Sequence, residues 1–258
     1  MKKLLLLFNK QALLLGLFLI SSLSWGQVTI SSQDFEATPA SPALTFANTG
    51  GGNSTGTNLA SGLPASANLF VSGSRGWQAV GTTTTLTFAN QSLSGYTSAF
   101  VDFRLAGMSV NESNGIDSGD VVTVSISVDG GTTYSSELTI AGSGANQRWA
   151  FSATGNATVT YDGNNTPTAV SSSGGSGGIS TVRINIPNAN TQIRVRISMT
   201  SGSNERWVID DVRIGGTVAA VPVVTGATIE ANVGVDPNYQ IVASNNPNAY
   251  STGTLPDG

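Results

Sequence analysis

Apolar side chains recur at every second position in several short segments, and this period restricts the fold more than any other feature of the sequence. The clearest segment runs from Asp120 to Asp129, where Val or Ile residues alternate with hydroxyl residues: Val122, Thr123, Val124, Ser125, Ile126, Ser127 and Val128. A period of two places successive side chains on opposite faces of a β-strand. Residues 182–186 and 193–199 repeat the pattern. Each segment therefore predicts a strand with one apolar and one polar face, as in an antiparallel sheet that is covered on one side.

Turn residues separate these segments at short intervals. The sequence DGG at 129–131 predicts a hairpin between the strand before it and Thr133–Ile140. Further strands are predicted at Val28–Glu36, Leu69–Val71, Gly76–Val80, Thr83–Phe88, Ala99–Ala106, Gln147–Ser152, Ala157–Tyr161 and Arg206–Ile214. The Gly- and Ser-rich tracts Asn48–Gly62 and Ser171–Gly178 are interpreted as surface loops. The chain is therefore predicted to be all-β, with an antiparallel two-sheet jelly-roll sandwich as its architecture.

The first 26 residues have the three parts of a secretory signal peptide. Lys2, Lys3 and Lys10 supply a basic region, Ala12–Ile20 supplies an apolar region, and small residues precede position 27. The apolar run is too short to span a hydrocarbon core about 30 Å thick. Residues 1–26 are therefore predicted to be a cleaved signal peptide, and the protein is expected to be secreted or held at the cell surface.

The signal peptide contains every lysine of the chain, and its removal changes the formal charge from −4 to −7. The sequence also contains no Cys and no His. These absences exclude disulfides, imidazole or thiolate metal sites, a Ser-His-Asp triad and a cysteine nucleophile. An acidic chain without lysine is also a poor ligand for nucleic-acid phosphates. The remaining chemistry is that of carboxylates, either as paired acids or as oxygen ligands of a hard cation such as Ca²⁺.

The composition changes after the last predicted strand and divides the mature chain into three parts. Residues 27–216 are predicted to form the jelly-roll domain, which is long enough to bury a sizeable core. Residues 217–226 (TVAAVPVVTG) are predicted to be a linker. Residues 227–258 are too few for an independent domain without disulfides or a metal. We interpret them as the start of an Ig-like β module that is cut short.

Three short motifs resemble the MAM-like, concanavalin-type jelly rolls: DFE at 34–36, VSISVDGGTTY at 124–134 and ERWVIDDVRI at 205–214. The middle motif resembles versions in large secreted proteins of Bacteroidetes, many of which are exported by the type IX system. The tail, with YQIVA at 239–243 and LPDG at 255–258, resembles the opening of a bacterial Ig-like module. The resemblance implies a jelly-roll fold and a cation near the first and last motifs.

Four carboxylates near the two ends of the domain form the leading candidate site. If Phe35 faces the core, Asp34 and Glu36 share the opposite face, and Asp210 and Asp211 are expected on opposite faces of the last strand. The first and last strands of a jelly roll often lie side by side, which would bring these side chains together. Ca²⁺ takes six to eight oxygen ligands. Asp34, Glu36, Asp210 and Asp211 are therefore predicted to hold a structural Ca²⁺ ion, with strand capping and pairing to arginines as the alternative.

Two further groups of residues carry weaker signals. Trp77, Trp149 and Tyr134 are candidates for a sugar-stacking platform, with burial in the core as the alternative for the tryptophans. The acidic stretch Asn111–Asp120 does not match the EF-hand spacing, so its acids are interpreted as solvated turn residues. Glu137 is the one acid in its predicted strand, so a glycosidase pair of acids is not expected there.

These observations predict a non-catalytic adhesion or glycan-binding domain of a secreted or cell-surface multidomain protein. The expected partner is an extracellular glycan or a surface protein, with no nucleic acid and no membrane insertion of the mature chain. A purely structural spacer and a carboxylate-dependent glycoside hydrolase are the two alternatives. No catalytic residue is predicted in this region.

Overall fold

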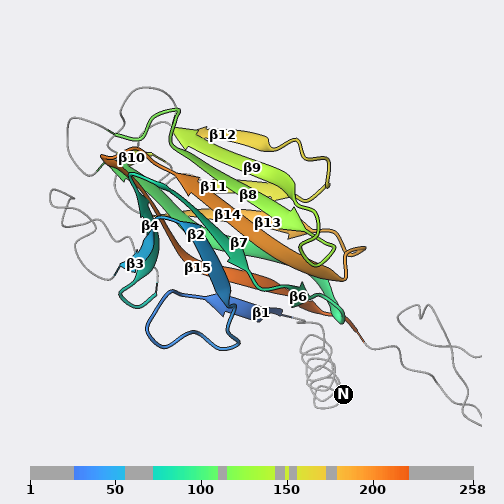
Figure 1. Cartoon of the computed structure of the whole chain (residues 1–258). Helices are drawn as coiled ribbons and strands as arrows, with labels where there is room; N and C mark the ends of the chain where they lie inside the picture. The colour runs from blue at the N-terminus through green and yellow to red at the C-terminus, as the bar shows by residue number, and fades with distance from the viewer. Residues whose placement is uncertain are drawn as a thin grey trace, which may run out of the picture. The chain divides into compact units, whose positions relative to one another are not determined.

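Two β-sheets packed face to face make up the described part of the protein in this computed structural model (Figure 1). The structure describes residues 26–55, 72–109, 115–142, 149–150, 156–172 and 179–220. These residues form strands, turns and bends but no helix, so they contain no helical segment suited to crossing a membrane. The prediction of an all-β two-sheet sandwich is confirmed.

The first sheet contains eight strands within the described residues. Six of them follow one another across the sheet, in the order β11 (Asn156–Thr160), β13 (Ser180–Ile186), β7 (Tyr96–Ser109), β15 (Glu205–Val218), β4 (Gly76–Val80) and β3 (Asn53–Thr55). The other two are β1 (Gln27–Gln33), which pairs with β15, and β10 (Trp149–Ala150), which pairs with β7. β7 and β15 each have 14 residues and form the centre of this sheet.

The second sheet contains seven strands within the same residues. Their order is β12 (Thr168–Ser172), β9 (Ser135–Gly142), β8 (Val121–Ser127), β14 (Gln192–Thr200), β5 (Thr83–Phe88) and β2 (Phe46–Gly50), with β6 (Gln91–Ser92) also paired to β14. Neighbouring strands are antiparallel except at one edge of each sheet, where β11 runs parallel to β13 and β12 runs parallel to β9. The antiparallel prediction therefore holds for every strand pair described except these two.

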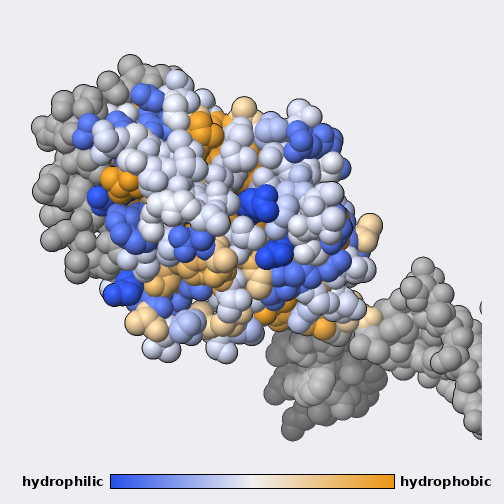
Figure 2. All heavy atoms as spheres, viewed as in Figure 1, coloured by the Kyte–Doolittle hydropathy of each residue, from blue (hydrophilic) through white to orange (hydrophobic). Residues whose placement is uncertain are grey.

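Alternation along the strands produces the core between the sheets. In β8, Val122, Val124 and Ile126 are fully buried, as the period of two predicts. Trp207 of β15 is also fully buried, and its Nε1 donates to the carbonyl oxygen of Thr200 at 3.1 Å. Because the chain has no cysteine, the stability of the sandwich rests on this packing and on the hydrogen bonds of the sheets. Figure 2 shows that the visible surface is mostly of intermediate hydropathy, with only small hydrophobic patches.

The first and last strands of the sandwich lie side by side, as predicted. β1 runs antiparallel to β15, with Gln33 opposite Val212. Phe35 lies two residues beyond β1 and is buried in the core, with 4% of its surface exposed. The prediction that Phe35 faces the core is confirmed. Asp34 and Glu36 therefore leave β1 close to the middle of β15.

The stretch Asn48–Gly62, interpreted from its composition as a loop, contributes to both sheets. Its first residues end β2 in the second sheet, and residues 53–55 form β3 in the first. Gly50 and Gly52 make the crossing between the sheets with φ angles of +84° and +128°, which side chains other than glycine rarely adopt. The loop interpretation is wrong for residues 48–50 and 53–55, because the glycines of a tight crossing between strands resemble those of a loop.

Several predicted features lie outside the described residues and stay predictions. They include residues 1–25 of the signal peptide, the strand at 69–71 and residues 173–178 of the Ser- and Gly-rich tract. The compact unit that contains the sandwich ends at Val218. Residues 221–258 are not described, so most of the predicted linker and all of the Ig-like segment are untested.

Candidate binding site

The outer face of the first sheet contains a hollow of about 480 Å³. Strands β1, β7, β13 and β15 contribute to its walls, together with the segment that precedes β4. The side chains that give the hollow its polar character are Asp34, Ser72, Asp102, Arg104, Asp211 and Arg213. Three carboxylates and two guanidinium groups therefore border the same small volume.

Alternation along β7 places Asp102 and Arg104 on this outer face. Val101, Phe103 and Leu105 are at most 1% exposed and belong to the core. The residues between them must point away from the core, because successive side chains of a strand point to opposite faces. The core of the sandwich therefore positions both charged side chains at the hollow.

A β-bulge in β15 brings two neighbouring carboxylates to the same place. Asp210 lies opposite Arg104 of β7, and the register shifts immediately after it. Both carboxylates reach Ser72: its hydroxyl donates to Oδ1 of Asp211 at 2.5 Å, and its backbone amide donates to Oδ2 of Asp210 at 3.5 Å. The prediction that Asp210 and Asp211 point to opposite faces is therefore wrong, because the extra residue of the bulge interrupts the alternation.

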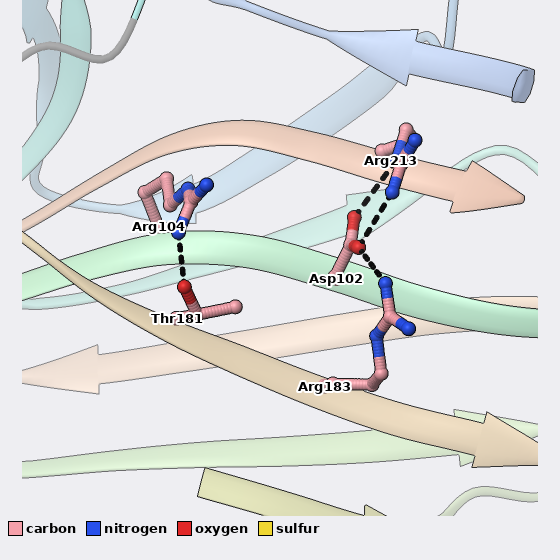
Figure 3. A network of polar contacts seen from close by, with 5 residues as sticks. All are labelled: Asp102, Arg104, Thr181, Arg183 and Arg213. Atoms are coloured by element: carbon pink, nitrogen blue, oxygen red, sulfur yellow. Dashed lines mark hydrogen bonds and ion pairs between the residues drawn. The ribbon is translucent and has the colours of Figure 1, made fainter. Parts of the chain in front are cut away.

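Asp102 is shared by two arginines (Figure 3). Its Oδ2 accepts a hydrogen bond from Nη2 of Arg183 at 2.5 Å and from Nη2 of Arg213 at 2.9 Å, and its Oδ1 accepts one from Nε of Arg213 at 3.1 Å. Both guanidinium groups lie over the ring of Phe100, at 4.0 and 4.9 Å from its centre. The hydrogen bonds that Arg213 donates to Asp102 raise the pKa of Arg213. The network therefore holds its two guanidinium groups in fixed positions at the surface of the sheet.

Arg104 occupies the next outward position of β7 and donates to Oγ1 of Thr181 (Figure 3). Arg183 and Arg213 share Asp102, whereas Arg104 lies opposite Asp210 of β15 in the sheet. A guanidinium has five N–H donors in a planar arrangement. Arg104 therefore retains donors that can bind an oxygen atom of a ligand in the hollow.

The two carboxylates at the end of β1 have different partners. Asp34 lines the hollow, and its Oδ1 accepts the backbone amide of Glu36 at 3.2 Å. Oε1 of Glu36 accepts the backbone amides of Ser74 and Arg75 at 2.6 and 2.5 Å. Glu36 therefore anchors the segment before β4, and its carboxylate is engaged there.

The predicted calcium ligands are only partly brought together. Asp34 and Asp211 line the hollow, Asp210 is fully buried beside Ser72, and Glu36 is bound to backbone amides. No three acidic side chains in the described part of the chain are arranged as a metal site. The residues therefore do not fit a four-carboxylate calcium cluster, and a cation held by Asp34 and Asp211 stays a prediction.

The three aromatic candidates lie in different environments. Trp77 is 8% exposed and packs against Phe46 of the second sheet, with 5.3 Å between the ring centres. Its prediction as a ligand-binding residue is wrong, because its ring fills the space between the two sheets. Tyr134 is partly exposed, but the guanidinium of Arg196 lies 3.6 Å from its ring centre and covers one face. The side chain of Trp149 lies outside the described residues.

A second, smaller hollow of about 310 Å³ is lined by Asp117, Asp120 and Glu205. Asp120 is 3% exposed, and its carboxylate accepts the backbone amides of Asp117 and Gly202, each at 2.8 Å. Burial raises the pKa of Asp120 and also that of Glu205. The interpretation of Asp120 as a solvated turn residue is therefore wrong: it joins the turn before β8 to the turn before β15.

Sequence reasoning does not single out Asp102, Arg104 and Arg183, although their positions carry a usable signal. Each is a charged residue between two apolar residues of a predicted strand. Alternation already places such residues on the outer face of the sheet. Charged residues of opposite sign on the outer face of predicted strands therefore indicate a candidate site from the amino-acid pattern alone.

Comparison with known proteins found no matching family model and no matching curated protein. Among solved structures, TmCBM61 in complex with β-1,4-galactotriose is 14% identical with a TM-score of 0.38, and the match covers 66% of this chain and 86% of that one. The K2 cleaved adhesin domain of Lys-gingipain is 16% identical with a TM-score of 0.41, covering 73% and 97%. The K3 domain from Porphyromonas gingivalis W83 is 14% identical with a TM-score of 0.38, covering 74% and 99%. At these identities and TM-scores the function has to be argued from the site itself.

Proposed function

We propose that this domain is a non-catalytic binding module whose ligand is a glycan held in the hollow of the first sheet. The observation that carries the proposal is the mixture of groups at the hollow, where the carboxylates of Asp34 and Asp211 lie near the guanidinium of Arg104. Carboxylates only accept hydrogen bonds and guanidinium groups only donate them. A sugar hydroxyl does both, so neighbouring hydroxyls of a glycan match such a mixture.

The lining of the hollow is held in place by contacts within the protein. Asp102 fixes Arg213, Asp211 accepts the hydroxyl of Ser72, and Glu36 anchors the segment that carries Ser72. A site with fixed side chains loses less conformational entropy when a ligand binds. The volume of about 480 Å³ lies within the range of small-molecule sites, which is about 300–1,000 Å³.

The two alternative functions make different demands on the structure. Hydrolysis of a glycosidic bond requires two carboxyl groups that flank the bond. Glu137 of β9 is 4% exposed, its Oε2 accepts the backbone amide of Asp162 at 3.2 Å, and it lines neither hollow. A structural spacer requires no ligand site. In a spacer, the charged side chains of the hollow would serve only to contact one another.

We also propose that the module is exported through its signal peptide and belongs to the MAM-like jelly rolls of multidomain proteins with type IX export. The support is that the first and last motifs of that resemblance meet in one place. Glu36 from the DFE motif and both Asp210 and Asp211 from the IDD motif accept hydrogen bonds from the segment 72–75, and Asp34 lines the hollow beside Ser72. In such a protein the module would attach other domains to a glycan or to a glycosylated surface.

The proposal is tested with a glycan array on the mature chain, followed by calorimetry with the strongest soluble oligosaccharide. Arg104→Gln removes the guanidinium that Arg104 contributes to the lining of the hollow. We expect this variant to bind at least tenfold more weakly. Arg75→Gln is the matched control, because Arg75 is exposed outside the hollow.

Three results would contradict the proposal. Absence of binding to every glycan on the array would favour the spacer. Equal affinities for Arg104→Gln and Arg75→Gln would place the ligand elsewhere on the protein. Hydrolysis of the oligosaccharide during the titration would favour the hydrolase.

A further inference from the structure

The outer face of the second sheet carries an ordered array of hydroxyl groups. One row crosses five strands and contains only Thr and Ser: Thr49, Thr85, Ser198, Thr123 and Thr139. The neighbouring row contains Ala47, Thr87, Arg196, Ser125 and Ser136. We call these ten residues the hydroxyl face. Eight of them carry a hydroxyl group, so the face repeats the same chemistry from strand to strand.

The core determines that this face points outward. Leu86, Val124 and Ile197 of three neighbouring strands are fully buried. The residues on either side of each must point away from the core. All residues of the hydroxyl face are partly or fully exposed except Ser125, which is 9% exposed.

Some hydroxyl groups of this face are fixed by bonds to one another. Oγ1 of Thr85 donates to Oγ of Ser198 at 3.1 Å, and the hydroxyls of Ser125 and Ser136 lie 3.1 Å apart. A hydroxyl has one donor and two acceptor positions. Each pair therefore orders its side chains and leaves further positions that a ligand can use.

The hydroxyl face contains no acidic and no large apolar residue. Its one charged residue is Arg196 of the middle strand, β14, and the guanidinium of Arg196 stacks on the ring of Tyr134. Sheet surfaces that face water commonly carry charges, which prevent association with other chains. The outer face of the first sheet carries such charges, at Asp102, Arg104 and Arg183. The low charge is therefore a property of the hydroxyl face and not of every surface of the sandwich.

These properties exclude most classes of partner. Protein interfaces are enriched in aromatic, Met and Arg residues, and the face contains one of these, Arg196, whose guanidinium is already stacked on Tyr134. Nucleic acids require a basic patch, and membranes require apolar side chains. A neutral ligand covered with hydroxyl groups requires none of these. Five strands about 4.8 Å apart extend the array over about 19 Å. A single neutral hydrogen bond adds little because water competes for it, so binding needs many such bonds at once.

We propose that the hydroxyl face docks flat on an ordered, neutral polysaccharide surface. The repeat of the strands presents hydroxyl groups at regular intervals, and an insoluble polysaccharide presents its own hydroxyl groups at regular intervals. This second surface lies on the sheet opposite the hollow. It goes beyond the binding of a soluble glycan, and either site can exist without the other.

The test is depletion of the mature chain from solution by particles of crystalline cellulose and of chitin. Thr85→Lys places a long, charged side chain in the middle of the hydroxyl face and should reduce the bound fraction at least fivefold. Thr85→Ser keeps the hydroxyl and should bind like the original protein. The matched control is Thr158→Lys, because Thr158 is exposed on β11 at the edge of the first sheet. Melting temperatures of all variants establish that each is folded.

Arg104→Gln separates this proposal from the one for the hollow. It should lose the soluble oligosaccharide and keep binding to the particles. The proposal for the hydroxyl face is overturned if neither particle depletes the protein. It is also overturned if Thr85→Lys, folded as judged by its melting temperature, binds as well as Thr158→Lys.

Discussion

The outer faces of the two sheets arise from the same alternation but differ in chemistry. On the first sheet, Asp102, Arg183 and Arg213 form an ion-paired network beside a hollow. On the second, the outward positions beside Val124 and Ile197 hold the hydroxyl residues Thr123, Ser125 and Ser198, with Arg196 as the one exception. The core determines which residues point outward in both sheets, but it does not determine their chemistry. In the functions proposed above, this difference assigns a discrete ligand to the hollow and an extended polysaccharide surface to the hydroxyl face.

The largest expected effect comes from a residue that belongs to neither outer face. Trp77→Ala removes a ring that contacts Phe46 across the two sheets, with 5.3 Å between ring centres. Loss of a buried Trp costs about 3–5 kcal/mol, so chemical denaturation should show a loss of this size. Trp77→Phe should lose less. A loss below about 1 kcal/mol for Trp77→Ala would indicate an exposed ring and would restore Trp77 as a candidate for sugar stacking.

A smaller difference in stability is expected between the two faces themselves. Asp102→Ala leaves two guanidinium groups over Phe100 without their shared acceptor, whose side chain is 13% exposed. Hydrogen bonds to charged groups contribute about 1.5–3 kcal/mol, and partial exposure places the expected loss near the lower end. Thr85→Ala on the hydroxyl face should cost less than about 0.5 kcal/mol. Urea denaturation of both variants measures the difference, and equal losses would contradict it.

The pH dependence of stability should differ between two acids near β8. Burial raises the pKa of Asp120, so the native state holds a proton that the unfolded chain has already released. The contribution of Asp120 to the free energy of unfolding therefore falls as the pH rises from about 4 through the raised pKa. The hydroxyl of Thr133 and further hydrogen bonds from Ser127 and backbone amides lower the pKa of Asp129. The ionised carboxylate of Asp129 therefore stabilises the fold above about pH 4, and this contribution is lost as the pH falls through the lowered pKa.

Two variants separate these opposite effects. Asp120→Asn should reduce the decline in melting temperature between about pH 4 and neutrality and leave the part that comes from the raised pKa of Glu205. Asp129→Asn should lower the melting temperature at neutral pH and reduce its loss in acid. Melting curves from pH 3 to 8 measure both slopes, and a parallel shift of the whole curve in both variants would contradict the assignment.

The smallest effect is expected from Ca²⁺. Asp34 and Asp211 line the hollow, but Glu36 is bound to backbone amides and Asp210 is buried beside Ser72. Two carboxylates form a weak site, so Ca²⁺ added after EDTA should raise the melting temperature by only about 1–2 °C, roughly the effect of 0.5 kcal/mol. Asp34→Asn combined with Asp211→Asn should abolish the shift. An equal shift in melting temperature in that double variant would show that Ca²⁺ binds outside the hollow.

Much of the fold could be predicted because alternation and turn residues are local signals. Gly76–Val80 and Thr83–Phe88 are strands with the predicted bounds. The pattern does not predict β2 and β12, because Phe46–Gly50 and Thr168–Ser172 are edge strands with few apolar residues. Their position depends on neighbouring strands that are distant in the sequence, which no local pattern reveals.

The site was harder to predict because it depends on one bulge. The apolar positions Trp207 and Ile209 are followed by Val212 and Ile214, so the spacing between the second and third is three residues. This change in spacing from two residues to three marks Asp211 as the extra residue of the bulge. The spacing could therefore have predicted that Asp210 and Asp211 lie on the same side of the sheet. The contacts of Ser72 with both carboxylates could not be predicted, because they join residues 138 and 139 positions apart.

The claim that the two faces bind different ligands is tested most directly by calorimetry with one soluble oligosaccharide and two variants. The array-selected oligosaccharide is titrated into Arg104→Gln and Thr85→Lys under the same conditions. We expect Arg104→Gln to bind at least tenfold more weakly than the original protein and Thr85→Lys to bind with unchanged affinity. Unchanged affinity in Arg104→Gln together with loss of binding in Thr85→Lys would contradict the assignment of the glycan to the hollow.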